Sequence, residues 1–161
     1  MDGRQWLVLE REEFKFSCAH MTVFPDGSKE RLHGHNYQLA IRLQISDTSY
    51  AAMIPFAEIK SVIRLFCKEW KEYLLLARDN PHFTIVSDAD ELEFLLCGKR
   101  YVLPREEVKL LPVDNITVEQ LAVYIGEHLR GRFPESVRRS AIEISLFESA
   151  GQGVTMMLEP N

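Results

Sequence analysis

The chain has 161 residues, a formal net charge of −5, and a composition that is 46% hydrophobic and 27% charged. This length favours one domain over residues 1–161, and the mixed charges, without a basic stripe, exclude nucleic acid as a partner. The three cysteines form no CxxC pair, which favours a reducing compartment. No run reaches the roughly 18 apolar residues of a membrane span, so we expect a cytoplasmic protein without a membrane partner.

Alternating apolar residues predict two paired strands in the first part of the chain. Residues 6–20 carry β-favouring side chains and end at His20, and residues 35–46 alternate apolar and polar side chains. Between them, a Pro-Asp-Gly turn signal predicts a loop over residues 21–32. We expect the two strands to pair as a hairpin.

The apolar period then changes to three and four residues, which predicts two helices. Residues 55–76 form an amphipathic pattern that Pro55 opens. Residues 115–133 form the second pattern, in which Thr117 and Gln120 fit a capping box.

The remaining segments complete an α+β pattern. Breaker residues predict a hairpin insert over about residues 82–104, and residues 140–149 and 153–159 predict a closing strand pair. The order of elements implies an antiparallel four-stranded sheet with two helices on one face plus the insert.

Three histidines form a constellation that can hold a metal ion. Residues i and i+2 of a strand share a face, so His33 and His35 point together, and the hairpin brings His20 beside them. Three imidazoles leave one position of a tetrahedral zinc open, as in catalytic sites, although iron or nickel also accept this ligand set. Cys18 shares the face, but we expect it to be packed. A His-x-His pair alone is a weak signal, because such histidines often simply lie at a surface.

Several segments in chain order, "FSCAH", "LHGHNY", "NITVEQLAVYI" and "LFES", resemble the 6-pyruvoyl-tetrahydropterin synthase family. That family includes the 6-carboxytetrahydropterin synthases. The resemblance covers nearly the whole chain and implies that His20, His33 and His35 bind one Zn²⁺ ion. It also implies the tunnelling fold, a small-molecule pterin substrate, and a homo-oligomer, commonly a hexamer built as a dimer of trimers, with active sites between subunits.

Three further residues match positions that bind the pterin in the family. Glu148, in "LFES", matches the glutamate that binds the pyrimidine edge, and a carboxylate can accept two parallel N–H bonds from such an edge. Thr117 and Glu119 match the "PTxE" segment that helps to close the pocket, with Ile116 in place of the proline. The alternatives are a helix first-turn acid for Glu119 and a surface charge for Glu148.

The usual catalytic residues of the family are missing from this chain. Lys29 stands four residues before His33, near the place of the family's cysteine, and Lys71 and Glu72 align with its Asp-His pair. However, "ERLHGH" matches the ExxHGH pattern of the type-III subgroup, with Glu30 replacing the cysteine. That subgroup converts 7,8-dihydroneopterin triphosphate to 6-hydroxymethyl-7,8-dihydropterin, which feeds folate synthesis.

The resemblance therefore implies a zinc-dependent pterin lyase with Glu30 as general base, a role that partial burial would favour by keeping its pKa near the working pH. Without the resemblance, Glu30 is a solvated loop charge. Glu72 is a second acid or base, or a surface partner of Lys68. Arg105 and Lys109 are candidates for substrate phosphates. The alternatives are 6-pyruvoyl- or 6-carboxytetrahydropterin synthase activity, or zinc and pterin binding without catalysis.

Overall fold

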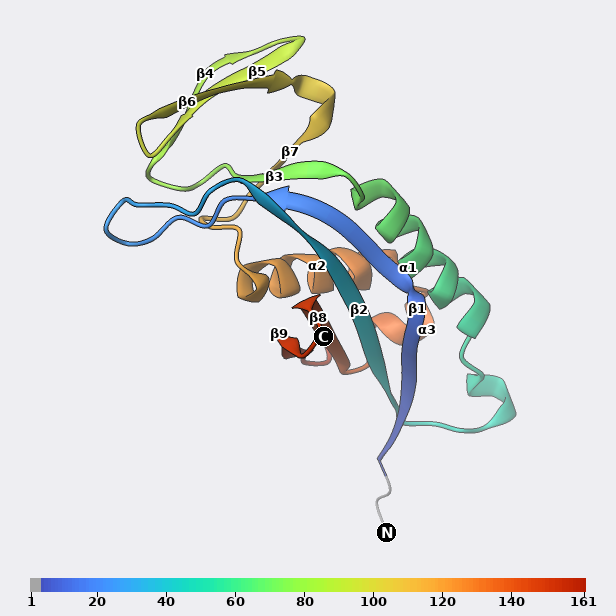
Figure 1. Ribbon diagram of the computed structural model, residues 1–161. Helices are drawn as coiled ribbons and strands as arrows, with labels where there is room; N and C mark the ends of the chain where they lie inside the picture. The colour runs from blue at the N-terminus through green and yellow to red at the C-terminus, as the bar shows by residue number, and fades with distance from the viewer. Residues whose placement is uncertain (1–3) are drawn as a thin grey trace.

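A curled six-stranded sheet is the frame of the protein, with the strand order β7-β3-β1-β2-β8-β9 (Figure 1). The computed structural model describes residues 4–161. The strands of this sheet are β1 (Gln5–His20), β2 (His33–Ile45), β3 (Tyr73–Ala77), β7 (Val108–Leu111), β8 (Ile142–Ser149) and β9 (Gln152–Leu158). Among the described residues, none of the helices is long and apolar enough to cross a membrane.

Strands β1 and β2 form the antiparallel hairpin that the sequence predicts. Their register pairs His20 with His33 and Cys18 with His35, so all four side chains belong to one face at the same end of the sheet. The register shifts between Glu10 and Lys15, which marks a bulge in the middle of the long first strand.

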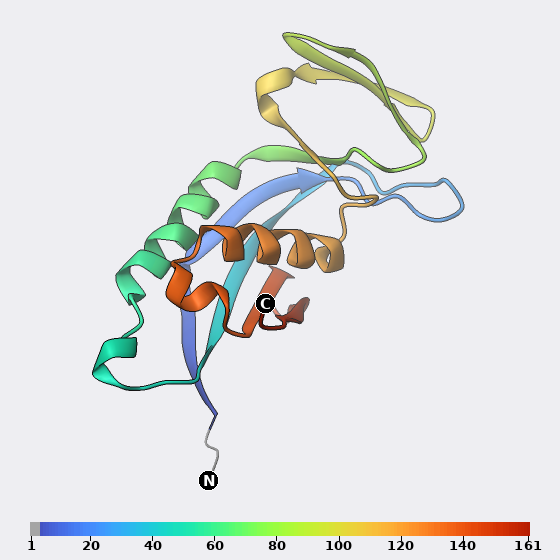
Figure 2. The same cartoon turned by 180° about the vertical axis from the view of Figure 1, so that it is seen from behind.

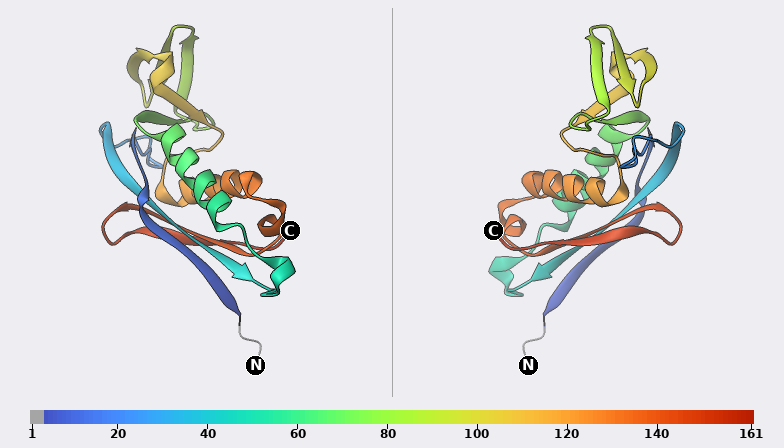
Figure 3. Two further views of the ribbon diagram at one scale, coloured as in Figure 1. Left: turned by 90° about the vertical axis from the view of Figure 1, so that its right-hand side faces the viewer. Right: turned by 90° about the vertical axis from the view of Figure 1, so that its left-hand side faces the viewer.

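Two long helices, α1 (Phe56–Trp70) and α2 (Val118–Arg132), cover the same face of the sheet (Figure 3). Their apolar sides join the inner face of the sheet in one core. Residues 4–161 also contain three short helices: η1 (Tyr50–Ala52), η2 (Arg105–Glu107) and α3 (Glu135–Arg138). Thr117 is the N-cap of α2 and accepts a bond from the Gln120 N–H at 3.4 Å. The Gln120 side chain, however, bonds to Asp114 instead of returning to the cap, so only half of the predicted capping box forms.

The predicted helix over residues 55–76 is wrong at its C-terminal end. Helix α1 ends at Trp70, Glu72 adopts a left-handed conformation with φ 68°, and Tyr73–Ala77 forms strand β3. Strand β3 pairs parallel with β1 and with β7. Its last four residues are all buried, as is typical of a parallel strand covered on both faces. The sheet is therefore a mixed one of six strands, and the predicted antiparallel sheet of four strands is corrected.

The insert lies within the predicted bounds of about 82–104 but has three strands, one more than the predicted hairpin. It forms a separate three-stranded antiparallel sheet from β4 (Phe83–Asp88), β5 (Glu91–Leu96) and β6 (Lys99–Pro104). Figure 2 shows this small sheet at one end of the molecule, beyond β3 and β7. Its buried side packs into a second core that also contains Met21 and Val23 from the loop between β1 and β2.

Candidate active site

The three predicted metal ligands meet at the end of the β1–β2 hairpin. One ring nitrogen from each of His20, His33 and His35 lies within 4.8 Å of the others. His20 is the last residue of β1, and His33 and His35 are near the start of β2. Gly34 lies between the two β2 ligands at a close approach, because a Cβ there would stand 3.1 Å from the carbonyl oxygen of Cys18. The Cys18 thiol donates to the carbonyl of Trp70 at 2.9 Å and is packed, as predicted.

Backbone carbonyls orient two of the imidazoles for metal binding. The Nδ1 atom of His20 lies 3.0 Å from the Ile116 carbonyl, and the Nδ1 atom of His33 lies 2.8 Å from the Arg31 carbonyl. A carbonyl only accepts, so each Nδ1 carries the proton and each Nε2 presents a lone pair. The buried Nε2 of His20 has no hydrogen-bond partner among the described residues. The imidazole Nε2 atoms therefore fit a bound metal ion, since a cation would satisfy the otherwise unpaired buried Nε2 of His20.

Burial also keeps His20 in the form that a metal needs. Desolvation lowers the pKa of His20, and although the Ile116 carbonyl opposes this, the neighbouring His33 and His35 lower it further. His20 is thus neutral at neutral pH, and a neutral imidazole is the ligand form.

Glu30 lies beside the histidines. Its Oε2 atom is 3.8 Å from the Nε2 of His33 and is buried, with no hydrogen-bond partner in the part of the chain that the structure describes. Burial raises the pKa of Glu30, but hydrogen bonding by Thr22 and the charges of His33 and His20 outweigh it, so that the pKa is lowered. The carboxyl is therefore ionised at neutral pH and can accept a proton. The expectation that partial burial keeps the pKa of Glu30 near the working pH is therefore wrong.

One cavity collects seven of the eight candidate residues. Its volume is about 370 Å³, and the three histidines and Glu30 line it together with Thr117, Glu119 and Glu148. Glu148 is mostly buried, with 15% of its side chain exposed, and its Oε2 lies 4.0 Å from the Nε2 of His35. Its other oxygen accepts a bond from Gln152 at 2.6 Å. The cavity thus offers an open cluster of imidazoles with carboxylates on its walls, which is enough space and chemistry for a small polar ligand.

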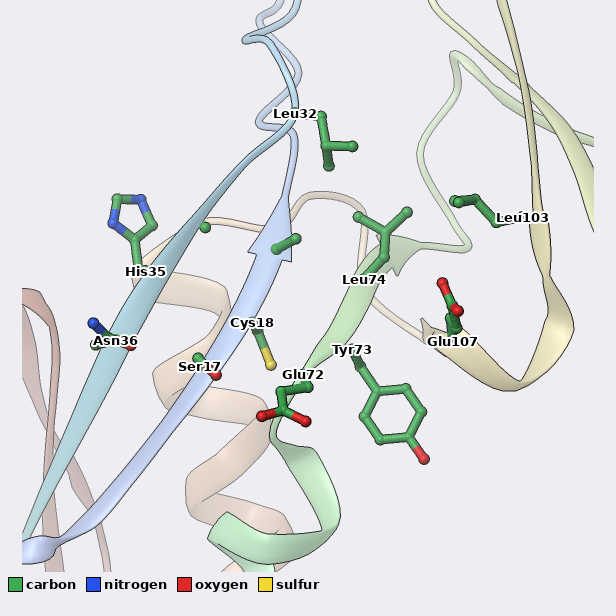
Figure 4. Close-up of a pocket in the computed structure, with 12 residues that line it drawn as sticks. Ser17, Cys18, Leu32, His35, Asn36, Glu72, Tyr73, Leu74, Leu103 and Glu107 are labelled. Atoms are coloured by element: carbon green, nitrogen blue, oxygen red, sulfur yellow. The ribbon is translucent and has the colours of Figure 1, made fainter.

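Glu72 lines a different cavity. This space of about 510 Å³ is bounded by strands β1, β2 and β3, and Glu72 faces it with Ser17, Asn36 and Tyr73 (Figure 4). His35 contributes to both cavities, but the Glu72 side chain is 74% exposed and does not line the histidine cavity. Within one chain, the structure does not bring Glu72 to the metal ligands.

The two cations considered for phosphate binding have partners of their own. Arg105 is paired with Asp88 at 2.6 Å and donates to the carbonyl of Val108 at 3.0 Å. The ammonium of Lys109 lies 4.4 Å from the ring centroid of Tyr73. Neither residue lines the histidine cavity.

Sequence reasoning missed four residues that line the histidine cavity: Thr22, Val118, Ser149 and Gln152. Thr22 was detectable in principle, since it follows His20 by two residues and extended chain repeats its side-chain direction at that spacing. Gln152 has no such signal, because it reaches the cavity only through the pairing of β9 with β8.

The fold and the site together define a class of protein: an α+β enzyme with an open three-histidine site beside carboxylates that can hold a metal ion and a small molecule. Comparison with known proteins gives the family. The sequence model of 6-pyruvoyl tetrahydropterin synthase matches residues 9–159. The chain therefore belongs to the 6-pyruvoyl tetrahydropterin synthase family and is an enzyme of the lyase type.

Individual relatives agree with this assignment. A protein of Methanocaldococcus jannaschii, which provisionally bears the name 6-carboxy-5,6,7,8-tetrahydropterin synthase, is 30% identical over 142 residues, or 86% of each chain. The crystal structure of 6-pyruvoyl tetrahydropterin synthase from Plasmodium vivax superposes with a TM-score of 0.87 at 25% identity, and 98% of this chain and 99% of that chain are covered. A variant of the P. vivax protein, in which a glutamate described as a catalytic residue is replaced by alanine, gives a TM-score of 0.86 at 23% identity over the same shares of the two chains.

Proposed function

We propose that the chain is a zinc-dependent lyase that cleaves the side chain of 7,8-dihydroneopterin triphosphate and releases 6-hydroxymethyl-7,8-dihydropterin, as in the type-III subgroup. The observation that carries this proposal is the Glu30 carboxylate, whose free Oε2 lies 3.8 Å from the Nε2 of His33. The resemblance puts a cysteine near this place in other members of the family. The catalytic glutamate of the P. vivax protein adds support.

Glu30 would act as the general base of the reaction. The carboxylate is charged at neutral pH, as a general base for the 2′-hydroxyl must be, although its lowered pKa makes it a weaker base than an ordinary glutamate. The C1′–C2′ bond then breaks, and its electron pair moves into the pterin ring. The 2′ carbon leaves as an aldehyde that keeps the triphosphate, and Glu30 returns the proton to C1′, which becomes the hydroxymethyl carbon.

The remaining residues of the cavity would hold the metal and orient the substrate. Zn²⁺ bound by the three histidines would supply a Lewis acid that acidifies the hydroxyls of the side chain. Glu148 would accept N–H bonds from the pyrimidine edge of the pterin, with Thr117 and Glu119 closing the pocket. The low exposure of Glu148 supports this, because a partly desolvated carboxylate binds such donors more strongly than a solvated one.

Glu72 would serve a neighbouring copy of the chain. Its exposure and its separation from the histidine cavity fit a second acid or base that is completed by assembly, with active sites between the subunits of a homo-oligomer. Its left-handed backbone at φ 68° is unfavourable for a residue with a side chain. Such strain is frequent where the position of a side chain matters for function.

A second candidate is 6-carboxytetrahydropterin synthase activity, which the name of the M. jannaschii relative favours. Both activities are tested by incubating the zinc-loaded protein with 7,8-dihydroneopterin triphosphate and identifying the product by chromatography. Hydroxymethyldihydropterin is the expected product. Carboxytetrahydropterin would establish the second candidate, and pterin binding without turnover would refute catalysis.

The role of Glu30 has its own test in the same assay. Glu30→Gln keeps the shape of the side chain but removes the base, so we expect the rate to fall at least about 100-fold, while the zinc content is unchanged. The matched control is Glu127→Gln, an exposed position on α2 outside the cavity, which should keep the full rate. Full turnover by Glu30→Gln would exclude Glu30 as the base.

A further inference from the structure

The segment before Glu30 forms a small turn that is held by hydrogen bonds within its own backbone. Val23 and Lys29 form an antiparallel bridge, and the Glu30 N–H donates to the carbonyl of Thr22 at 2.9 Å. Gly27, at the tip, has a φ of 82°, a left-handed conformation that favours glycine. The backbone of Glu30 is thus hydrogen-bonded to Thr22, close to His20 in the chain. These contacts alone hold only a short, largely exposed turn.

Lys29 connects this turn to the rest of the structure. Its ammonium donates to the carbonyl of Glu30 at 3.0 Å and contacts the sulfur of Met21 at 3.4 Å. The same ammonium lies 5.3 Å from the ring centroid of Tyr101, within the range of a cation–π interaction. One side chain therefore joins both arms of the loop to strand β6 of the insert.

The insert offers a rigid surface for this contact. The Tyr101 ring stacks on Phe94, with centroids 5.1 Å apart and an angle of 13° between the planes, and Phe94 is fully buried. At the tip of the loop, a Cβ on Gly27 would stand 3.2 Å from the ring of His82, which precedes β4. Figures 1 and 2 show the loop and the insert at the same end of the molecule. The second core joins them, because it contains Met21 and the inner residues of β5.

We propose that Lys29 and Tyr101 are positioning residues, through which the three-stranded insert holds the Glu30 carboxylate at the histidine cavity. The proposal rests on the proposed role of Glu30 as the base. A displacement of about 1 Å at a catalytic group can cost about 100-fold in rate. Loss of the Lys29 contacts is therefore expected to lower kcat by about 10- to 100-fold and to leave KM and zinc content unchanged, since neither residue lines the cavity.

The test compares paired variants at both positions. Lys29→Met keeps an apolar stem but loses the donor, whereas Lys29→Arg keeps a cation and should restore most of the rate. Tyr101→Leu loses the ring, whereas Tyr101→Phe keeps it and should match the parent protein. Lys99→Met, at an exposed lysine of the same insert, is the control for loss of a charge.

A second readout does not depend on activity. Amide hydrogen exchange of a peptide spanning residues 24–31 should become about 10-fold faster in Lys29→Met and Tyr101→Leu, and not in Lys99→Met, because the turn loses its anchor. Unchanged exchange in Lys29→Met would overturn the proposal. So would parent kcat in that variant, or a loss of rate that merely follows a loss of zinc or of thermal stability.

The same assays separate this proposal from the role of Glu30. If Glu30→Gln retains full turnover, the base assignment fails and the positioning role fails with it. If Glu30→Gln is inactive while Lys29→Met and Tyr101→Leu keep the parent kcat, Glu30 stands and only the positioning role is refuted.

Discussion

Replacing Gly34 by alanine tests how tightly the two strands of the proposed metal site are packed. The new Cβ would stand 3.1 Å from the carbonyl oxygen and 3.7 Å from the carbonyl carbon of Cys18, and both are backbone atoms that cannot rotate away. Overpacking of this kind costs about 1–3 kcal/mol. The lower entropy of the unfolded alanine chain offsets about 0.4–1 kcal/mol. We therefore expect Gly34→Ala to lower the free energy of unfolding by about 1 kcal/mol.

The larger effect should fall on the metal, because Gly34 separates His33 from His35. Ligand distances at a metal site tolerate only about 0.2 Å of error, and relief of the clash moves the strands by a few tenths of an ångström. By analogy with lost supporting contacts at metal sites, we expect zinc affinity to fall about 10- to 100-fold.

The assay is urea unfolding of the metal-free protein together with zinc titration against a competing chelator. Gly131→Ala is the matched control, because among the described residues a Cβ at that helix position meets no atom within 4 Å beyond its chain neighbours and the backbone of its own helix. It should leave zinc affinity unchanged and stabilise the protein by up to about 1 kcal/mol. If Gly34→Ala binds zinc as tightly as the parent and unfolds at the same urea concentration, the close approach of the strands is not required for metal binding or for stability.

Three further predictions concern the ligands and the helix beside them. His33→Ala should lose bound metal, measured by elemental analysis, whereas His82→Ala, at a position that does not line the histidine cavity, should retain it; full occupancy in His33→Ala would exclude that ligand. The pKa of His20 is lowered in the folded protein, so the unfolded chain binds more protons at acid pH. The free energy of unfolding of the metal-free protein should therefore decrease as pH falls through about 6.5. His20→Gln should remove this pH dependence in unfolding experiments from pH 8 to 5. Thr117→Ala removes the N-cap of α2 and should cost about 1 kcal/mol in the same experiments, whereas the exposed Thr48→Ala should cost nothing; equal effects would argue against capping.

Local sequence patterns were sufficient to predict the hairpin of β1 and β2 and the face of the hairpin that carries the histidines. Alternation with a period of two is a property of neighbouring residues, so the sequence predicts that His33 and His35 point together. It also predicts the pairing that brings His20 to them, because a turn signal lies between the two strands. The cap at Thr117 belongs to the same kind of information, since it is a residue type at a fixed spacing from a helix start. Glu30, by contrast, was singled out only by the resemblance to the ExxHGH pattern.

The tertiary structure decided the features that depend on burial on two sides. The run Tyr73–Ala77 has no period that separates a strand from the end of a helix, and only its position between β1 and β7 makes it a strand. Glu72, which directly precedes that strand, therefore lines a different cavity from the one that the histidines line. The contact between Lys29 and Tyr101 likewise joins residues far apart in the chain. Sequence periodicity reports on one face of one element, whereas a site assembled from several elements depends on which faces finally meet.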